Sequence, residues 1–171
     1  MRKICLLLVT IYIFFCGITI AHAEFQKNEP NGFRNIKWDA SISMYDKEMV
    51  FVKKELDTSY YFRKDDKMSI GACVVDEIFY KFDSKGFIGA QIHARNEDNY
   101  MKLLKVCVDN WGTPKKGVMY YYQWHGNITK VDCTYNTTTR KIIMFINSVE
   151  GEMRRANFEK KATESAGQSD F

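Results

Sequence analysis

Proline is scarce in this sequence, and the motifs of catalytic and cofactor chemistry are missing from it. Only Pro30 and Pro114 occur among the 171 residues, with no linker rich in Gly, Ser or Pro between them, which excludes a second large domain. No G-x-S-x-G, P-loop, dinucleotide-binding glycine, H-E-x-x-H or C-x-x-C pattern occurs. The sequence therefore identifies no catalytic residue and no cofactor. Its 46% hydrophobic and 27% charged residues predict a chain that folds.

An export signal opens the chain. Arg2-Lys3 precedes an uncharged apolar run over residues 4–20, and Ala21-His22-Ala23 has the small-x-small pattern that signal peptidase cleaves. We therefore expect a signal peptide over residues 1–23 and a mature protein that begins at Glu24. A permanent membrane anchor is the rival interpretation, but an apolar run of about 17 residues is at the short limit for crossing a bilayer.

The mature chain has an even charge balance. Removing residues 1–23 takes two of the 25 Lys and Arg and none of the 21 Asp and Glu, which leaves 23 cations against 21 acids and a net charge of +2. Binding to nucleic acid requires a strongly basic face, which this balance does not indicate. We expect a periplasmic or secreted protein with no nucleic-acid partner and with no stable membrane span after signal cleavage.

The most informative stretch predicts a β-hairpin around Gly126-Asn127, a pair typical of a two-residue type II′ turn. That turn sets a register with one largely apolar face and one polar face. The apolar face pairs Trp124 with Thr129, Tyr122 with Val131 and Tyr120 with Cys133. The polar face pairs Gln123 with Lys130 and Tyr121 with Asp132. Such a hairpin belongs to an antiparallel sheet with one covered and one wetter face.

A second predicted hairpin precedes it. A three-residue loop, Ser84-Lys85-Gly86, with a positive φ at Gly86, matches apolar residues across the strands. The expected pairs are Phe82 with Ile88, Tyr80 with Ala90, Ile78 with Ile92 and Glu77 with His93. We interpret Glu77 and His93 as an exposed cross-strand contact rather than a catalytic dyad.

Between the hairpins, apolar residues recur at steps of three and four and predict the main helix: Tyr100, Leu103, Leu104, Cys107 and Trp111. Asn96 is its expected N-cap and Gly112 its end.

Further expectations are a short helix that begins near Asp39 or Ser41, one or two irregular strands over Phe51–Arg63 and a last strand over Arg140–Asn147. The fold class is thus a single α+β domain over residues 24–148, with an antiparallel sheet of hairpins and one main helix packed on one face. Residues 149–171 are expected to be a charged, partly disordered tail in which Glu150–Lys161 could form a solvated helix.

Three cysteines remain in the mature chain, Cys73, Cys107 and Cys133. One disulfide with one free thiol is compatible with this count, and so are three reduced thiols. Cys107 and Cys133 are placed on a helix and on the sheet beneath it, and layers about 10 Å apart are too distant for a disulfide. If a bond forms, we expect it between Cys73 and Cys133 across neighbouring strands.

The candidate binding residues are Tyr121, Gln123 and Lys130, on the wetter face of the hairpin around Gly126-Asn127. An exposed tyrosine with adaptable polar neighbours is typical of recognition surfaces. His93 and His125 are the two histidines of the mature chain, and neither has the spacing of metal ligands, so no metal site is predicted. We interpret His125 as a solvated turn residue.

Two segments resemble a group of small exported bacterial proteins of unassigned function. These segments are Gly32-Phe33-Arg34-Asn35-Ile36-Lys37-Trp38 and Asn110-Trp111-Gly112-Thr113-Pro114. The group is similar to them in having a G-F-R-x-I-x-W-G-[TS] start and a [YW]-G-x-P helix stop, although this chain has Asp39-Ala40 in place of Gly and a small hydroxyl residue. The resemblance covers Gly32 to Phe145 and implies an exported α+β domain without a known activity.

These observations favour a non-catalytic module that binds an envelope protein or another envelope component through the wetter sheet face. An envelope hydrolase or redox enzyme with scattered site residues is the main alternative. A pocket that holds Cys73, Cys107 or Cys133 beside a histidine would favour it. An inhibitor of an envelope-acting enzyme is the second alternative.

Overall fold

The computed structural model describes Phe25 and residues 27–169, so the expected signal peptide over residues 1–23 lies outside the described residues. Eight strands form one sheet in the order β3-β4-β7-β8-β12-β11-β10-β9, and all neighbours are antiparallel. Their bounds are Met49–Glu55 (β3), Thr58–Arg63 (β4), Glu77–Phe82 (β7), Phe87–Arg95 (β8), Lys115–Lys116 (β9), Tyr121–His125 (β10), Thr129–Asn136 (β11) and Lys141–Ser148 (β12).

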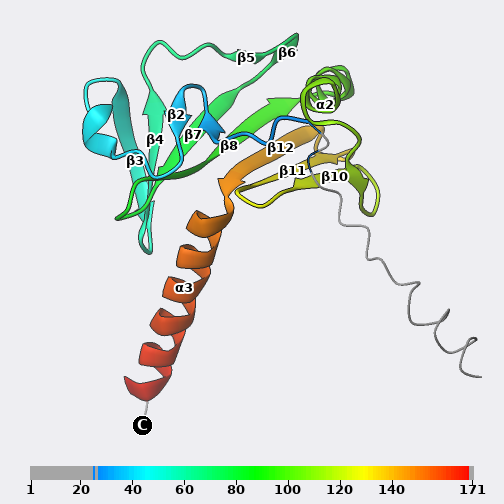
Figure 1. Ribbon diagram of the computed structural model, residues 1–171. Coiled ribbons are helices and arrows are strands. Elements are labelled where there is room, and N and C mark those ends of the chain that lie inside the picture. Colours follow the sequence, from blue (N-terminus) through cyan, green and yellow to red (C-terminus); the bar gives the residue numbers. More distant parts are fainter. Residues whose placement is uncertain (1–24, 26, 170–171) are drawn as a thin grey trace, which may run out of the picture.

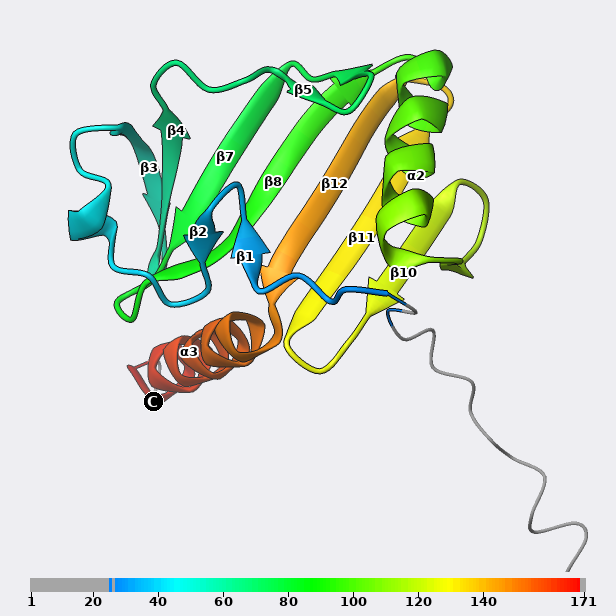
Figure 2. The same cartoon turned by 45° about the horizontal axis from the view of Figure 1, so that its top comes forward.

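The smaller elements are arranged unevenly about this sheet. The helix α2 (Glu97–Trp111), the hairpin β1–β2 (Gly32–Phe33 and Ile36–Lys37) and the hairpin β5–β6 (Ser69–Ile70 and Cys73–Val74) lie over one face (Figure 1; Figure 2). The helix α3 (Val149–Ser169) leaves from the end of β12 and points away from α2 (Figure 1). The predicted α+β class with an antiparallel sheet is confirmed.

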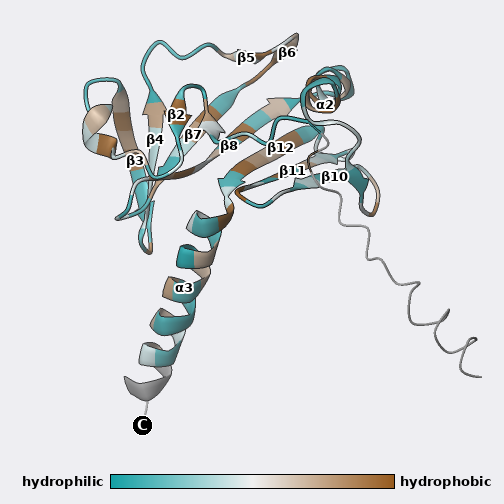
Figure 3. Ribbon diagram, in the orientation of Figure 1, coloured by the Kyte–Doolittle hydropathy of each residue, from teal (hydrophilic) through white to brown (hydrophobic). Residues whose placement is uncertain are grey.

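Packing between α2 and the sheet forms the core. Alternate residues of the central strands point toward α2, since strand side chains alternate between faces, and they are almost completely buried. Apolar residues concentrate in the strands, whereas α3 is mostly hydrophilic (Figure 3). The largest core side chains include Tyr80, Phe87, Ile92, Tyr100, Leu103, Trp124, Ile142 and Met144.

The helix α2 lies where the apolar periodicity predicts it. Tyr100, Leu103 and Cys107 are its buried residues. It ends at Gly112, whose φ of 87° favours glycine and whose N–H donates to the Val108 carbonyl. Asn96 is the N-cap residue as expected, but its side chain makes no capping hydrogen bond with the described residues. Its backbone N–H instead donates to Arg140 at 3.0 Å, which ties the helix start to the turn before β12.

An N-terminal strap, residues 27–40, crosses the same face as α2. The Trp38 indole stacks on Phe87 at 5.2 Å between ring centroids and donates to the Thr129 hydroxyl at 2.9 Å. The strap thereby links β8 to β11. A Cβ on Gly86, whose φ is 144°, would lie 2.4 Å from the Asp39 carbonyl oxygen, so this close approach requires glycine.

The first hairpin, β7–β8, has the predicted register over most of its length. Glu77 lies opposite His93 and Tyr80 opposite Ala90, but the expected pair of Phe82 with Ile88 is wrong, since Phe82 lies opposite Phe87 across a register shift. The shift places both phenylalanines in the core, 5.2 Å apart between ring centroids. Ile88 then packs on the opposite face, under Gly151 of α3.

The register of the second hairpin, β10–β11, differs from the predicted one by two residues. His125, rather than Gln123, lies opposite Lys130. The reason is Glu29 of the strap, whose carboxylate accepts the N–H groups of Ile128 and Thr129, both at 2.7 Å. These bonds stabilise a wider loop than a two-residue turn. Because the difference is an even number, every side chain keeps its predicted face.

Two further elements differ from the expectations. The short N-terminal helix is a single 3-10 turn, Ile42–Met44. It cannot extend to Met49 as expected, because Met49 is already the first residue of β3. The chain after Ser148 forms the helix that the sequence allowed over Glu150–Lys161, but this helix is longer and continues through Ser169. Its start is fixed by tertiary contacts of Arg154, which binds Asp39 at 2.6 Å and Asp83 at 2.7 Å. No helix in the described part of the chain is long and apolar enough to cross a membrane.

Leu103 tests the packing of α2 on the sheet. Its side chain is 0% exposed, whereas Met101 on the same helix is 56% exposed. Leu103→Ala should lower the free energy of unfolding by about 2–5 kcal/mol, because it removes buried methyl groups and leaves a cavity. Met101→Ala should change it by less than about 0.5 kcal/mol. Urea denaturation of both variants measures the difference, and equal midpoints would contradict the orientation of α2.

Candidate functional site

The face of the sheet opposite α2, called the open face here, is the candidate site. Its central row runs across five neighbouring strands through directly opposite residues, Phe79, Gln91, Phe145, Asp132 and Gln123. A parallel row contains Glu77, His93, Ile143, Thr134 and Tyr121. All ten side chains are partly exposed or exposed. Within the described chain, only the first turns of α3 lie against this face.

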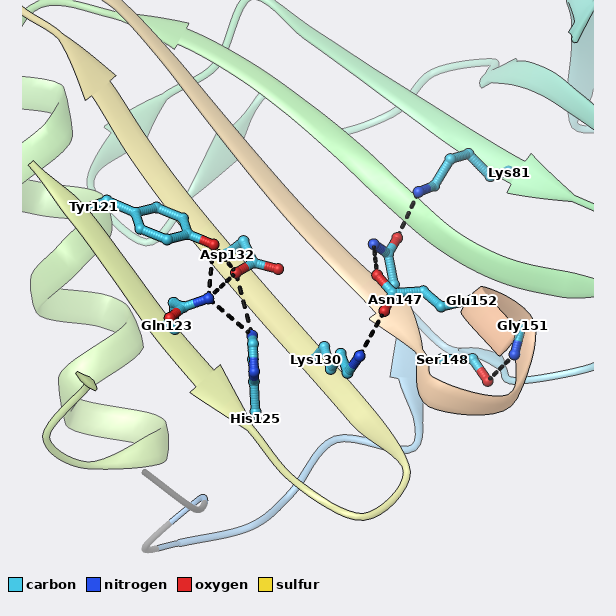
Figure 4. Close-up of polar contacts among 10 residues, drawn as sticks. All are labelled: Lys81, Tyr121, Gln123, His125, Lys130, Asp132, Asn147, Ser148, Gly151 and Glu152. Atoms are coloured by element: carbon cyan, nitrogen blue, oxygen red, sulfur yellow. Dashed lines mark hydrogen bonds and ion pairs between the residues drawn. The ribbon is translucent and has the colours of Figure 1, made fainter. Parts of the chain in front are cut away.

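Asp132 is the centre of a polar cluster on β10 and β11 (Figure 4). Its Oδ1 accepts the Tyr121 hydroxyl at 2.6 Å and the Gln123 amide at 2.9 Å, and it lies 3.2 Å from Nε2 of His125. Burial alone would raise the pKa of Asp132, but these three contacts outweigh it and hold the pKa below its usual value. The carboxylate is therefore ionised and fixed in place before any partner binds.

Tyr121 is held by the same cluster. Its hydroxyl donates to Asp132 and accepts from the Gln123 amide at 2.7 Å. Burial and, to a smaller extent, the hydrogen bond to the Asp132 carboxylate together raise the pKa of Tyr121 to about 12. The phenol is thus a neutral donor with a fixed orientation.

The three predicted binding residues are divided between two sites. Tyr121 and Gln123 belong to the cluster, whereas Lys130 forms an ion pair with Glu152 at 3.1 Å and anchors α3 (Figure 4). The sequence interpretation missed Asp132 and His125 as members of the cluster. The alternation of side chains along β10 and β11 was the signal for them, since it places both residues on the face of Tyr121.

Aromatic rings extend across the open face from Phe145, beside the polar cluster, to Phe79 on β7. Phe79 contacts the Phe62 ring at 4.7 Å and the His93 ring at 5.6 Å between centroids. Phe145 lies between Gln91 and Asp132 in the central row and stays partly exposed. The open face therefore combines apolar area at its centre with fixed polar groups at one side.

Lys81 is buried where α3 meets the open face. Its ammonium donates to Oδ1 of Asn147 (Figure 4). The same ammonium lies 5.5 Å from the centroid of the Phe145 ring. The described residues provide no carboxylate within ion-pair distance. A hollow of about 310 Å³ lies beside it, lined by residues that include Glu152 and Arg155. Burial, with a smaller contribution from the positive Arg155, lowers the pKa of Lys81 to about 8.

A larger hollow of about 430 Å³ lies at the other end of the open face, near Glu77 and His93. Nδ1 of His93 lies 3.0 Å from the Glu77 carboxylate, and Nε2 lies 2.7 Å from the Gln91 amide. Both imidazole nitrogens are thus engaged, and the eight residues that line the hollow include no Ser, Thr or Cys. This is the geometry of the cross-strand contact expected from the sequence.

The three cysteines are buried free thiols, which is one of the two states that their count left open, and the pairing of Cys73 with Cys133 that was expected if a disulfide forms is not present. The reason is the strand order, because Cys73 is on β6, which pairs with β5 in a separate two-stranded sheet rather than with β11. Burial raises the pKa of Cys73 to about 11 and of Cys133 to about 12, and raises that of Cys107 strongly. All three therefore act as small apolar side chains. No group of three or more potential metal ligands occurs among the described residues.

Comparisons with family models, with curated proteins and with solved structures found no match to this chain. The functional conclusion therefore depends on the geometry of the open face.

The buried Lys81 predicts a dependence of stability on pH. Its pKa is about 8 in the folded protein and 10.5 without burial, so between these values the unfolded chain binds more protons. The free energy of unfolding should therefore rise as the pH increases from 7.5 to 9.5. Across the whole interval between the two pKa values, Lys81 contributes up to about 3 kcal/mol to this rise.

Lys81→Met removes this titrating group while keeping the length of the side chain. We expect its unfolding free energy to increase less with pH than that of the wild type, as measured by urea denaturation at each pH. Lys85→Met, at an exposed loop position, should follow the wild type. Parallel curves for Lys81→Met and the wild type would show that Lys81 is not buried as described.

Proposed function

We propose that this protein is an exported, non-catalytic binding domain that holds an envelope protein or another envelope component on its open face. One observation carries this proposal. The Asp132 cluster, already hydrogen-bonded, lies beside the partly exposed ring of Phe145, and Phe79 lies two strands further along the same row, on a face that the described chain covers only near α3. Partly exposed rings beside polar groups are a common composition of protein interfaces.

The cluster favours recognition because its groups need little reorganisation. Ordering a flexible side chain costs about 0.5–1.5 kcal/mol on binding, and Tyr121 and Gln123 are already held by Asp132. Oδ1 of Asp132 accepts all of these bonds, whereas Oδ2 makes no hydrogen bond with the described residues. A donor group of the partner can therefore bind Oδ2 while apolar groups of the partner cover Phe145.

Export is the second part of the proposal. It is supported by the basic start, the apolar run over residues 4–20 and the cleavage pattern Ala21-His22-Ala23. The resemblance to small exported bacterial proteins points in the same direction. An exported domain with a prepared binding face meets partners of the cell envelope, which is why we assign the partner to that compartment.

Gln91→Arg tests the open face. Gln91 lies between Phe79 and Phe145 in the central row, so a longer charged side chain there should block a partner without removing a core residue. Met101→Arg makes a comparable change on the exposed side of α2. Both variants and the wild type are immobilised and used to capture components from a periplasmic extract, with mass spectrometry as the readout.

A component that binds the wild type and Met101→Arg, but whose capture by Gln91→Arg falls at least about tenfold, supports the proposal. Equal capture by all three proteins would place the interaction elsewhere. Circular dichroism and thermal unfolding of each variant confirm that the comparison is between folded proteins.

A further inference from the structure

The loop between β9 and β10 carries an exposed apolar tip. Val118 is 84% exposed and Met119 is 73% exposed, more than any other large apolar side chain of the described residues. The two residues are consecutive, and their loop projects from the edge of the sheet beyond α2 (Figure 2). Adjacent apolar side chains that are held in solvent indicate a contact with something outside the described chain.

This loop is fastened at its base. The N–H of Gly117 donates to the Tyr121 carbonyl at 2.8 Å, which closes the hairpin. The Tyr120 carbonyl accepts the Tyr135 N–H at 3.1 Å and the Tyr100 hydroxyl at 3.0 Å. The Tyr120 ring also packs edge-on against the rings of both tyrosines. The base of the loop is therefore tied to α2 and β11, and the tip is held away from them.

Met119 has a backbone conformation that does not suit its side chain. Its φ is 57°, in the left-handed region that glycine or asparagine adopts at lower cost than a bulky residue. The side chain also fills no space inside the domain, since it is mostly exposed. Local structure therefore gives no reason for a methionine here, whereas a contact made by the side chain itself does.

Two lysines lie at the base of the tip, one on each face of the hairpin. Lys116 lies opposite Tyr122, whose ring faces α2, and Lys115 lies opposite Gln123 on the open face. Both lysines are exposed, and neither forms an ion pair with the described residues. Their ammonium groups can therefore contact negative charge on either side of the tip.

The order of side chains along the hairpin matches the layers of a membrane surface. The apolar pair is outermost, Tyr120 follows at 39% exposed, and the lysines of β9 lie behind it. Apolar groups enter the hydrocarbon, tyrosine prefers the interface, and lysine is attracted to anionic headgroups. A protein partner fits this small tip less well, because a standard protein interface uses about 20–30 residues from each side.

We propose that the β9–β10 hairpin is a membrane-contact site, which inserts Val118 and Met119 into the surface of a bilayer that contains anionic phospholipid. The contact is reversible, because a small apolar insertion holds a protein at a membrane only together with a second attraction, here the charge of the lysines. The sheet and α2 stay outside the bilayer. This site is separate from the open face and does not depend on the partner proposed for that face.

Co-sedimentation with vesicles tests the site. The mature protein, from Glu24, is mixed with vesicles of phosphatidylethanolamine and phosphatidylglycerol, and we expect it to bind them more tightly than neutral phosphatidylcholine vesicles. Met119→Ser should weaken binding to the anionic vesicles by at least about fivefold, because it removes an inserted apolar side chain. Met44→Ser makes the same change at a position 70% exposed near the other edge of the sheet, and it should bind as the wild type does.

Charge removal tests the lysines. Lys115→Gln combined with Lys116→Gln should weaken binding to the anionic vesicles by about tenfold or more, because each lysine near an anionic surface adds to the attraction. Lys160→Gln combined with Lys161→Gln removes a consecutive, exposed pair on α3, and it should leave binding unchanged. Thermal unfolding of each variant separates an effect on binding from loss of the fold.

Val118→Cys tests insertion directly. The native Cys73, Cys107 and Cys133 are buried, so a polarity-sensitive fluorophore attaches to the folded variant at the new position alone. Its emission should shift to the blue with anionic vesicles, whereas the same fluorophore on Met44→Cys should not respond.

Three results would overturn the proposal. The first is a wild type that does not bind anionic vesicles, and the second is equal binding by Met119→Ser and Met44→Ser. The third is a fluorophore on Val118→Cys that responds to a periplasmic protein extract but not to vesicles, which would assign the loop to a protein partner.

Discussion

Packing on one side of the sheet is the constraint on which the rest of this structure depends. The described chain supplies one layer of helix and hairpins, and this layer covers the face that carries Tyr80, Ile92 and Met144. Because strand side chains alternate, each of these buried residues places its neighbours on the opposite face. Hydrogen bonds and ring contacts stabilise that face in place of a second covering layer, which leaves it accessible to a partner.

Two tethers keep this arrangement in register. The N-terminal strap binds β11 through Glu29 and packs on β8 through Trp38, so residues about a hundred positions apart determine the shape of one loop. At the other end, Arg154 of α3 holds both the strap, at Asp39, and the β7–β8 loop, at Asp83. Arg154 thus joins α3 to the strap and to the β7–β8 loop at one end of the sheet, and the central part of the open face remains clear of these elements.

Local patterns predicted the elements but not the contacts between distant segments. The periodicity of Tyr100, Leu103 and Cys107 located α2, and apolar matching located most of the β7–β8 register. The loop after His125 could not be predicted from its own residues, because Glu29 determines its width from a distant position. The same limit applies to the site. Tyr121 and Gln123 could be assigned to the wetter face from alternation, whereas the burial of Lys81 follows only from the docking of α3.

Solvent relaxation measured by nuclear magnetic resonance tests the central claim that one face of the sheet is uncovered. A soluble paramagnetic probe is added to the mature protein, and relaxation rates are compared for residues that alternate along β8 and β12. The account predicts strong enhancement for the side-chain amide of Gln91 and the ring of Phe145, and little for the neighbouring Ile92 and Met144, which are buried. Equal protection of both sets would show that another element covers the open face and would contradict the account.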